Sequence, residues 1–258
     1  MTSPWIAAVA ALFLWWFFTG AILMVVQNAD KGGRDRHVWT VLLTTPALLL
    51  GVFGYMQTLQ SEGVADIYVA FVSILAIWGW IELTFLAGIV TGPNTSDCPR
   101  GLPEWERFIR AWGTLAYHEM LLLAALLVLG YLSQGATNPF GFWTFAVLYF
   151  ARISAKLNLY LGVPRINTEF LTQSLSHLPS HFRIASMNAL FPVSVTVLAF
   201  ATACWLERIY SATTAAEIVG FALLTALTAL ALLEHWFMVI PLPDAKLWRW
   251  LMPAPNQK

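Results

Sequence analysis

Seven ionisable side chains fall inside long apolar stretches of this sequence, where a charge is costly unless it is paired or used. They are Glu82, His118, Glu119, Arg152, Lys156, Glu234 and His235. Carboxylates and imidazoles can bind a metal ion, and a neutral imidazole can hold the central magnesium of a tetrapyrrole. Arg152 and Lys156 are candidate ion-pair cations for the carboxylates. The residue types therefore indicate an ion-pair network, a metal or pigment site, or a metal-dependent active site.

The order of these residues argues against the best-known helical metal centre. Carboxylate-bridged di-iron bundles place Glu and His three residues apart, so that both face inward. Here His118 adjoins Glu119, and Glu234 adjoins His235. Adjacent residues on a helix diverge by about 100°, so we expect the two members of each pair to point in different directions.

A second histidine pair, His177 and His181, has the spacing of one helical face and is a secondary candidate for metal binding. Pro179 lies between the two histidines and favours a solvated loop instead. The sequence contains no P-loop, dinucleotide fingerprint, zinc-protease signature or serine nucleophile elbow. The catalytic residues and the metal ligands, where these exist, stay unknown from the sequence.

The composition places these residues in a membrane protein. Of the 258 residues, 59% are hydrophobic and 11% are charged, whereas soluble domains are about 45–50% apolar and about 25% charged. The formal net charge is zero, without the clustered basic excess that nucleic-acid binding requires. We therefore expect membrane lipids, and no nucleic acid, among the partners.

Seven apolar stretches are each long enough to cross a bilayer, which takes about 20 helical residues. The stretches are residues 4–27, 38–60, 66–91, 110–132, 140–163, 189–211 and 214–240. We expect an all-α integral membrane protein with seven transmembrane helices, which form a single domain over residues 1–258. The first stretch is about twice as long as a signal-peptide core and is expected to be retained.

Basic residues concentrate in alternate loops. Eleven Lys and Arg residues fall in the first, third and fifth loops and the C-terminal tail, against Arg208 alone in the other loops. Positively charged loops stay in the cytoplasm, which predicts a periplasmic N-terminus and a cytoplasmic C-terminus. With this topology, six of the seven ionisable residues lie about 8–14 Å from the cytoplasmic ends of their spans, and Arg152 lies one turn deeper. The sequence therefore predicts one charged layer near the cytoplasmic face.

Three cytoplasmic segments have an amphipathic pattern, near residues 103–112, 168–185 and 244–252. In the first, Trp105, Phe108, Ile109 and Trp112 recur at helical spacing. Aromatic residues beside basic ones are typical of helices that lie on lipid headgroups. Docking to a partner protein is the alternative.

Several longer strings carry a family resemblance. They are GTLAYHEM at 113–120, LNLYLGVPRINTEFL at 157–171, MNALFPVSVT at 187–196 and LLEHWFMVIPLPDAKLWRW at 232–250. Together they resemble the PuhE-type photosynthetic complex assembly proteins of purple phototrophic bacteria, whose gene lies near that of the reaction-centre H subunit. The resemblance implies a multi-pass protein of the bacterial inner, intracytoplasmic photosynthetic membrane. It further implies partners among reaction-centre subunits, light-harvesting subunits and other assembly proteins.

Two functions follow as alternatives. The first is a membrane-embedded assembly factor or scaffold for the reaction centre and light-harvesting complex, which handles bacteriochlorophyll. The second is a metal-dependent membrane oxidoreductase that acts on a tetrapyrrole or isoprenoid lipid, since carboxylates and imidazoles share one depth. We favour the first, and a non-enzymatic role, because the sequence has no catalytic motif. Bacteriochlorophyll and a bound metal ion are accordingly the two candidate cofactors.

Overall fold

Helices make up most of the computed structural model, which describes residues 2–168 and 171–241. The long helices are α1 (Pro4–Asp30), α2 (Gly33–Thr58), α3 (Val64–Leu86), α4 (Glu104–Gly113), α5 (Ala116–Leu132), α6 (Phe140–Leu161), α7 (Leu190–Ser211) and α8 (Ala215–Phe237). The described part of the chain contains no strand beyond an isolated bridge between Val163 and Ile184. The amphipathic segment expected near 244–252 lies outside the described residues.

Five helices are long and apolar enough to cross a membrane, namely α1, α2, α3, α7 and α8. The bent pair α4 and α5 passes the same test when it is taken as one span. The prediction of an all-helical, multi-pass membrane protein is therefore confirmed. The described helices give five or six candidate spans, and α6 is not among them because polar residues such as Arg152 and Lys156 interrupt its apolar stretch. The count of seven spans and the orientation of the termini stay predictions.

The span expected over 110–132 is divided in the structure. Helices α4 and α5 bend by 68° relative to each other. At the junction the Thr114 hydroxyl donates to the Ala111 carbonyl over 2.7 Å, and Leu115 leaves helical geometry with φ −136° and ψ 8°. The helix of the bundle within this stretch, α5, accordingly begins at Ala116. The amphipathic segment expected near 103–112 corresponds to the separate helix α4, in which Trp105 is largely exposed.

The other long helices start and end within five residues of the limits expected for them. The largest difference at a C-terminus is that of α3, which ends at Leu86 and not near residue 91. Gly88 adopts φ +72°, a left-handed conformation that glycine tolerates and that commonly ends a helix. The Ile89 amide then donates to the Thr84 carbonyl over 3.0 Å. The helix therefore stops for a local backbone reason that hydropathy does not report.

The segment expected to be amphipathic near 168–185 has two short 3-10 helices within its described residues, η1 (Gln173–Leu175) and η2 (Leu178–His181). Pro179 has no amide hydrogen to donate, so a continuous α-helix is disfavoured here. Leu175 is fully buried and belongs to the same cluster as Phe85 of α3. The segment therefore covers the α4 end of the bundle.

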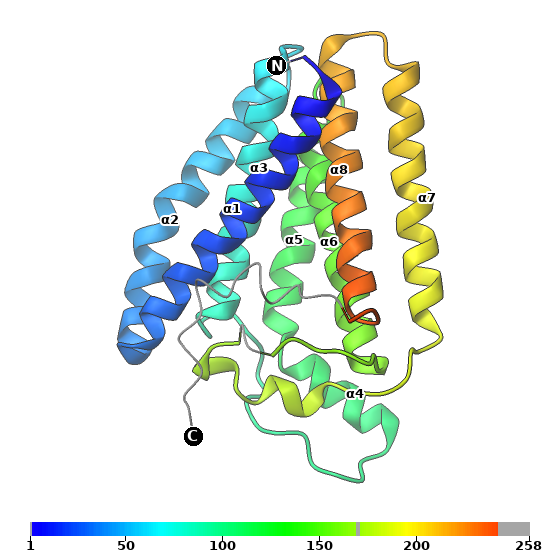
Figure 1. Ribbon diagram of the computed structural model, residues 1–258. Helices are drawn as coiled ribbons and strands as arrows, with labels where there is room; N and C mark the ends of the chain where they lie inside the picture. Colours follow the sequence, from blue (N-terminus) through cyan, green and yellow to red (C-terminus); the bar gives the residue numbers. More distant parts are fainter. Residues whose placement is uncertain (1, 169–170, 242–258) are drawn as a thin grey trace.

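The long helices form two layers (Figure 1). Helices α2, α1, α8 and α7 lie side by side in one layer, and α3, α5 and α6 lie behind them. Helix α3 contacts α1, α2, α5, α6 and α8 and is the central element. Glu82 and Phe85 are carried near the C-terminal end of α3, so the most buried helix also supplies part of the charged layer.

Small residues bring α1 and α8 together at the end of the bundle that carries the N-terminus. Ala7 and Ala11 of α1 are 0% and 1% exposed and share a core cluster with Val219 and Leu223 of α8. Towards the α4 end the two helices diverge (Figure 1). The wider α4 end is where the ionisable residues lie.

Candidate functional site

A cavity of about 700 Å³ is lined by residues of α1, α3, α4, α5, α6 and α8, in the half of the bundle nearer α4. Its walls are mainly apolar and include the rings of Trp15 and Phe18 from α1, Trp78 from α3 and Tyr149 from α6. Cavities of about 300–1,000 Å³ with a few polar groups are typical binding sites for small molecules. The size and lining therefore favour a hydrophobic or amphiphilic occupant.

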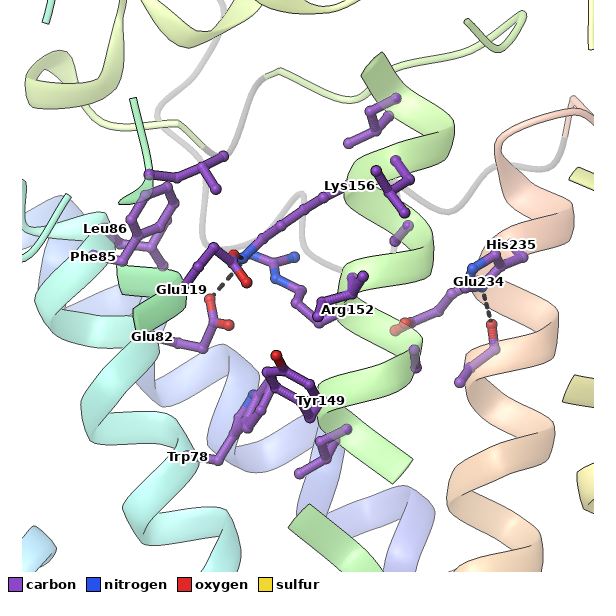
Figure 2. Close-up of a pocket in the computed structure, with 18 of the residues that line it drawn as sticks. Trp78, Glu82, Phe85, Leu86, Glu119, Tyr149, Arg152, Lys156, Glu234 and His235 are labelled. Carbon is purple, nitrogen blue, oxygen red and sulfur yellow. Dashed lines mark hydrogen bonds and ion pairs between the residues drawn. The ribbon is translucent and has the colours of Figure 1, made fainter. Parts of the chain in front are cut away.

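An ion pair between Glu82 of α3 and Arg152 of α6 borders the cavity (Figure 2). Glu82 Oε2 accepts from Arg152 Nη2 over 3.0 Å. Glu82 is 8% exposed, so its carboxylate has little water to replace this partner. In surroundings of low dielectric constant a paired charge is tolerated, whereas an unpaired one costs several kcal/mol. The pair therefore makes a carboxylate tenable inside the bundle.

A second ion pair joins Lys156 of α6 to Glu119 of α5. Lys156 Nζ also lies 5.6 Å from the centroid of the Phe85 ring, which places the ammonium group against an aromatic face. Arg152 and Lys156 are four residues apart on one face of α6, and each meets a different helix. Helix α6 thus ties α3 and α5 together through charges.

His118 lies beside these pairs but outside the cavity lining. Its ring is fully buried, and the centroid lies 4.4 Å from that of Phe85. His118 Nε2 is 3.7 Å from Glu82 Oε1, which is beyond hydrogen-bond distance. Neither ring nitrogen has a hydrogen-bond partner in the described part of the chain. His118 therefore fills space beside Glu82 and does not face the cavity.

Glu234 and His235 of α8 point in different directions, as their adjacency predicts. His235 Nδ1 lies 2.8 Å from the Ala231 carbonyl, and its Nε2 lies 2.9 Å from the Ser154 hydroxyl. A carbonyl only accepts, so Nδ1 carries the proton and Nε2 accepts from Ser154 in the neutral ring. Both nitrogens of His235 are engaged, which leaves none free to ligate a metal or pigment.

Glu234 extends from α8 toward α6 and lines the cavity (Figure 2). Within residues 2–168 and 171–241 its carboxyl group makes no hydrogen bond or ion pair. Arg152 is the charged group that interacts with it electrostatically at longer range. Glu234 is therefore the cavity carboxyl group that is still available to an occupant.

The described residues contain no group of three or more His, Cys, Asp or Glu side chains placed to share a metal ion. Glu82 and Glu119 each face a cation, and His235 is bonded within the protein. Of the chemistries that the sequence left open, the geometry favours the ion-pair network.

His177 and His181 lie in the connection between α6 and α7. They are 6% and 2% exposed, so the expectation of a solvated loop was wrong. The buried leucines of η1 and η2 fold this connection against the end of α3, and the histidines are buried with them. His181 Nε2 donates to the Ser96 carbonyl over 3.1 Å. His177 Nε2 and His181 Nδ1 have no hydrogen-bond partner within the described residues.

Acid is expected to loosen this connection through His177. Burial lowers the pKa of His177 below its usual value of about 6.5, and nearby His181 lowers it further, while Asp97 opposes both. A lowered pKa in the folded state means that the unfolded segment binds the proton more readily. The stability contribution is thus complete above about pH 6.5 and is lost as the pH falls below it. Amide hydrogen exchange over residues 173–181, corrected for intrinsic rates, should rise between pH 7.5 and 5.5.

The control for this pH effect is His177→Phe, which keeps a buried ring and removes the titrating group. The variant should show a smaller rise in exchange over the same pH interval. An equal rise in the two proteins would assign the effect to another group.

A second set of polar contacts joins α6 to α7 and was not predicted. Asn158 is fully buried and donates to the Ser154 carbonyl and the Ser194 hydroxyl, both over 2.9 Å. Asn188 donates to Asn158 Oδ1 over 3.0 Å and to the Gly162 carbonyl over 2.8 Å. Ser154 and Asn158 recur four residues apart in an apolar stretch, and that spacing would have indicated a buried polar face.

These features define a multi-pass helical membrane protein in which paired charges border an apolar cavity. The chain belongs to the family described as "Protein of unknown function (DUF3623)", whose model matches residues 1–258. It is 53% identical over 254 residues to a Rhodobacter capsulatus protein described as an uncharacterized 30.4 kDa protein in the puhA 5′ region. That similarity covers 98% of this chain and 93% of the relative. No solved structure matches the chain.

Proposed function

We propose that this protein is a membrane-embedded assembly factor or scaffold for the photosynthetic reaction centre and light-harvesting complex, and that it handles bacteriochlorophyll. The observation that carries the proposal is the near full-length similarity to a protein from the puhA region, together with the resemblance to proteins encoded near the reaction-centre H-subunit gene. The aromatic cavity supports the pigment-handling part, because it can take up a large apolar group within the bundle.

The proposed topology has seven spans, with α6 as one of them. Helix α6 has 22 residues, about the length that a bilayer requires, and lies among the other long helices. Its Arg152 and Lys156 are paired with Glu82 and Glu119, so these charges do not oppose a position inside the membrane. A periplasmic N-terminus places α4 and the charged end of the cavity on the cytoplasmic side. The protein then resides in the inner, intracytoplasmic photosynthetic membrane, in contact with lipids and with subunits of the photosynthetic complexes.

The geometry favours this role over a metal-dependent oxidoreductase. Such an enzyme needs several side chains that are free to hold a metal near the substrate. The carboxylates of Glu82 and Glu119 face cations, and both ring nitrogens of His235 are engaged. These ion pairs and hydrogen bonds instead hold the helices in place around the cavity, which suits a scaffold.

Deleting the gene in a phototrophic host is expected to lower the amount of assembled reaction centre several-fold. Without the factor, subunits and pigment meet less efficiently, and unassembled subunits are degraded. Absorption spectra of isolated membranes measure the assembled complexes, and antibodies against reaction-centre subunits show whether synthesis continues. The control is the same strain with the gene restored on a plasmid. Unchanged reaction-centre and antenna absorption after deletion would refute the proposed role.

A further inference from the structure

The cavity is lined on one side by α1 and α8, which pack against each other as neighbouring helices. These helices touch through Ala7 and Ala11 of α1, which are packed against Val219 and Leu223 of α8. Further along, Trp15 of α1 and Leu227 of α8 both line the cavity. In Figure 1 the two helices diverge from that level toward the α4 end. Both helices are long and apolar enough to cross a membrane, so lipid would surround this side of the protein.

The polar groups of the cavity differ in whether they are free to bond to an occupant. Arg152 and Lys156 each form an ion pair with a carboxylate. Arg165, at the α4 end of the cavity, donates to the Ile240 carbonyl over 2.7 Å. Glu234, by contrast, lines the cavity without a hydrogen bond or ion pair in the described part of the chain. An occupant therefore meets a carboxyl group that can accept hydrogen bonds.

These observations restrict the chemistry of the occupant. The aromatic and aliphatic walls suit a long apolar chain. A head group that donates hydrogen bonds is stabilised at Glu234, most strongly when that carboxyl is ionised. An anionic head group would be repelled by Glu234 whenever that carboxyl is ionised, and Arg152, the cation that interacts with Glu234, is already paired with Glu82.

We infer that the cavity binds a membrane amphiphile with a long apolar chain and a hydrogen-bond-donating head group, which enters between α1 and α8 and is held at Glu234. A hydroxyl group and an amine share this chemistry. The inference goes beyond the assembly role, since it concerns what the cavity binds and by which route.

Photolabelling of the full-length protein in lipid nanodiscs tests the head group. The probes are three diazirine-bearing chains of equal length that end in a primary alcohol, a primary amine or a carboxylic acid. We expect the alcohol or the amine to label residues 15–23 and 227–238 more strongly than the acid. Labelling by both indicates hydrogen-bond donation alone, and labelling by the amine alone indicates an ammonium head. Labelling by the acid at least as strong as by the other two would overturn the inference.

Variants of Glu234, compared with a surface control, show whether a change in labelling comes from this side chain and not from misfolding. Glu234→Leu should lower labelling by the preferred probe about tenfold, the factor expected when one hydrogen bond to a charged group is lost. Glu234→Gln keeps a hydrogen-bond acceptor and should retain labelling by the alcohol while it loses any preference for the amine. The matched control is Glu207→Leu on the exposed surface of α7, which should label as the unmodified protein does. Full labelling of Glu234→Leu would exclude Glu234 as the anchor.

Two bulky substitutions test the route. Thr19→Trp narrows the cavity on its α1 wall, and Ala111→Trp narrows it on the α4 side. Entry from the lipid predicts slower labelling for Thr19→Trp and an unchanged rate for Ala111→Trp. Slower labelling for Ala111→Trp alone would overturn the lateral route. Because purified protein is used, a negative result here leaves the gene-deletion test of the assembly role standing, and the reverse also holds.

Discussion

Arg152→Met is expected to lower the free energy of unfolding by about 3–5 kcal/mol. The substitution removes the cation 3.0 Å from Glu82 and leaves a carboxylate that is 8% exposed among apolar side chains. The loss is large because the buried carboxylate would have little water around it, and Lys156, which also attracts it, is already paired with Glu119. Unfolding in mixed dodecyl maltoside and SDS, followed by circular dichroism, measures the change.

The double variant Glu82→Gln with Arg152→Met shows whether the loss of stability comes from the unpaired charge of Glu82 or from the altered packing of the Arg152 side chain. It removes both charges, so most of the lost stability should return. Arg34→Met provides a matched control, since Arg34 is exposed at the start of α2 and should tolerate the change. A double variant as unstable as Arg152→Met would show that the ion pair is not the cause.

Asn158→Leu is expected to have the second-largest effect, a loss of about 2–3 kcal/mol. Asn158 is fully buried, and its amide group bonds to Ser194 of α7 and to Asn188 ahead of α7. Leucine has a similar volume but removes the donor to the Ser194 hydroxyl and one acceptor of Asn188, so α7 should detach from α6 more easily. Amide hydrogen exchange at the start of α7, beside the unfolding measurement, locates the effect.

The control for this prediction is Asn28→Leu, which changes an exposed asparagine of α1 in the same way. It should leave the free energy of unfolding nearly unchanged. Equal losses in the two variants would mean that the contacts of Asn158 do not hold α7 to the bundle.

The helices were largely predictable because each needs only a continuous apolar stretch. Hydropathy did not reveal the 68° bend between α4 and α5, since the bend depends on the backbone of Leu115 and the hydroxyl of Thr114. It also placed the end of α3 too late, because the chain leaves the helix at Gly88 while the sequence remains apolar. Local backbone geometry, and not composition, decided these boundaries.

The sequence indicates how far along each helix the site residues lie, but not the direction in which each helix points them. Counting residues from the span ends placed Glu82, Glu119, Arg152 and Lys156 at similar depth, and in the structure these four residues form two ion pairs. The rotation of each helix about its axis depends on packing, so the sequence could not show that Glu234 lines the cavity. The partners of His235 were equally inaccessible, because they depend on how α8 packs against α6. The cavity is lined by residues from six helices and the α6–α7 connection, so it depends on how these helices pack and not on a local sequence pattern.

The central claim is that this cavity serves the assembly of the photosynthetic complexes. The most direct test replaces the chromosomal gene with one that encodes Glu234→Leu and measures reaction-centre absorption per unit of membrane protein. The unmodified and deletion strains are measured beside it, and an antibody confirms that the variant reaches the membrane in the unmodified amount. We expect the absorption to fall toward that of the deletion strain. Reaction-centre absorption equal to that of the unmodified strain, at an equal amount of variant protein, would contradict the claim.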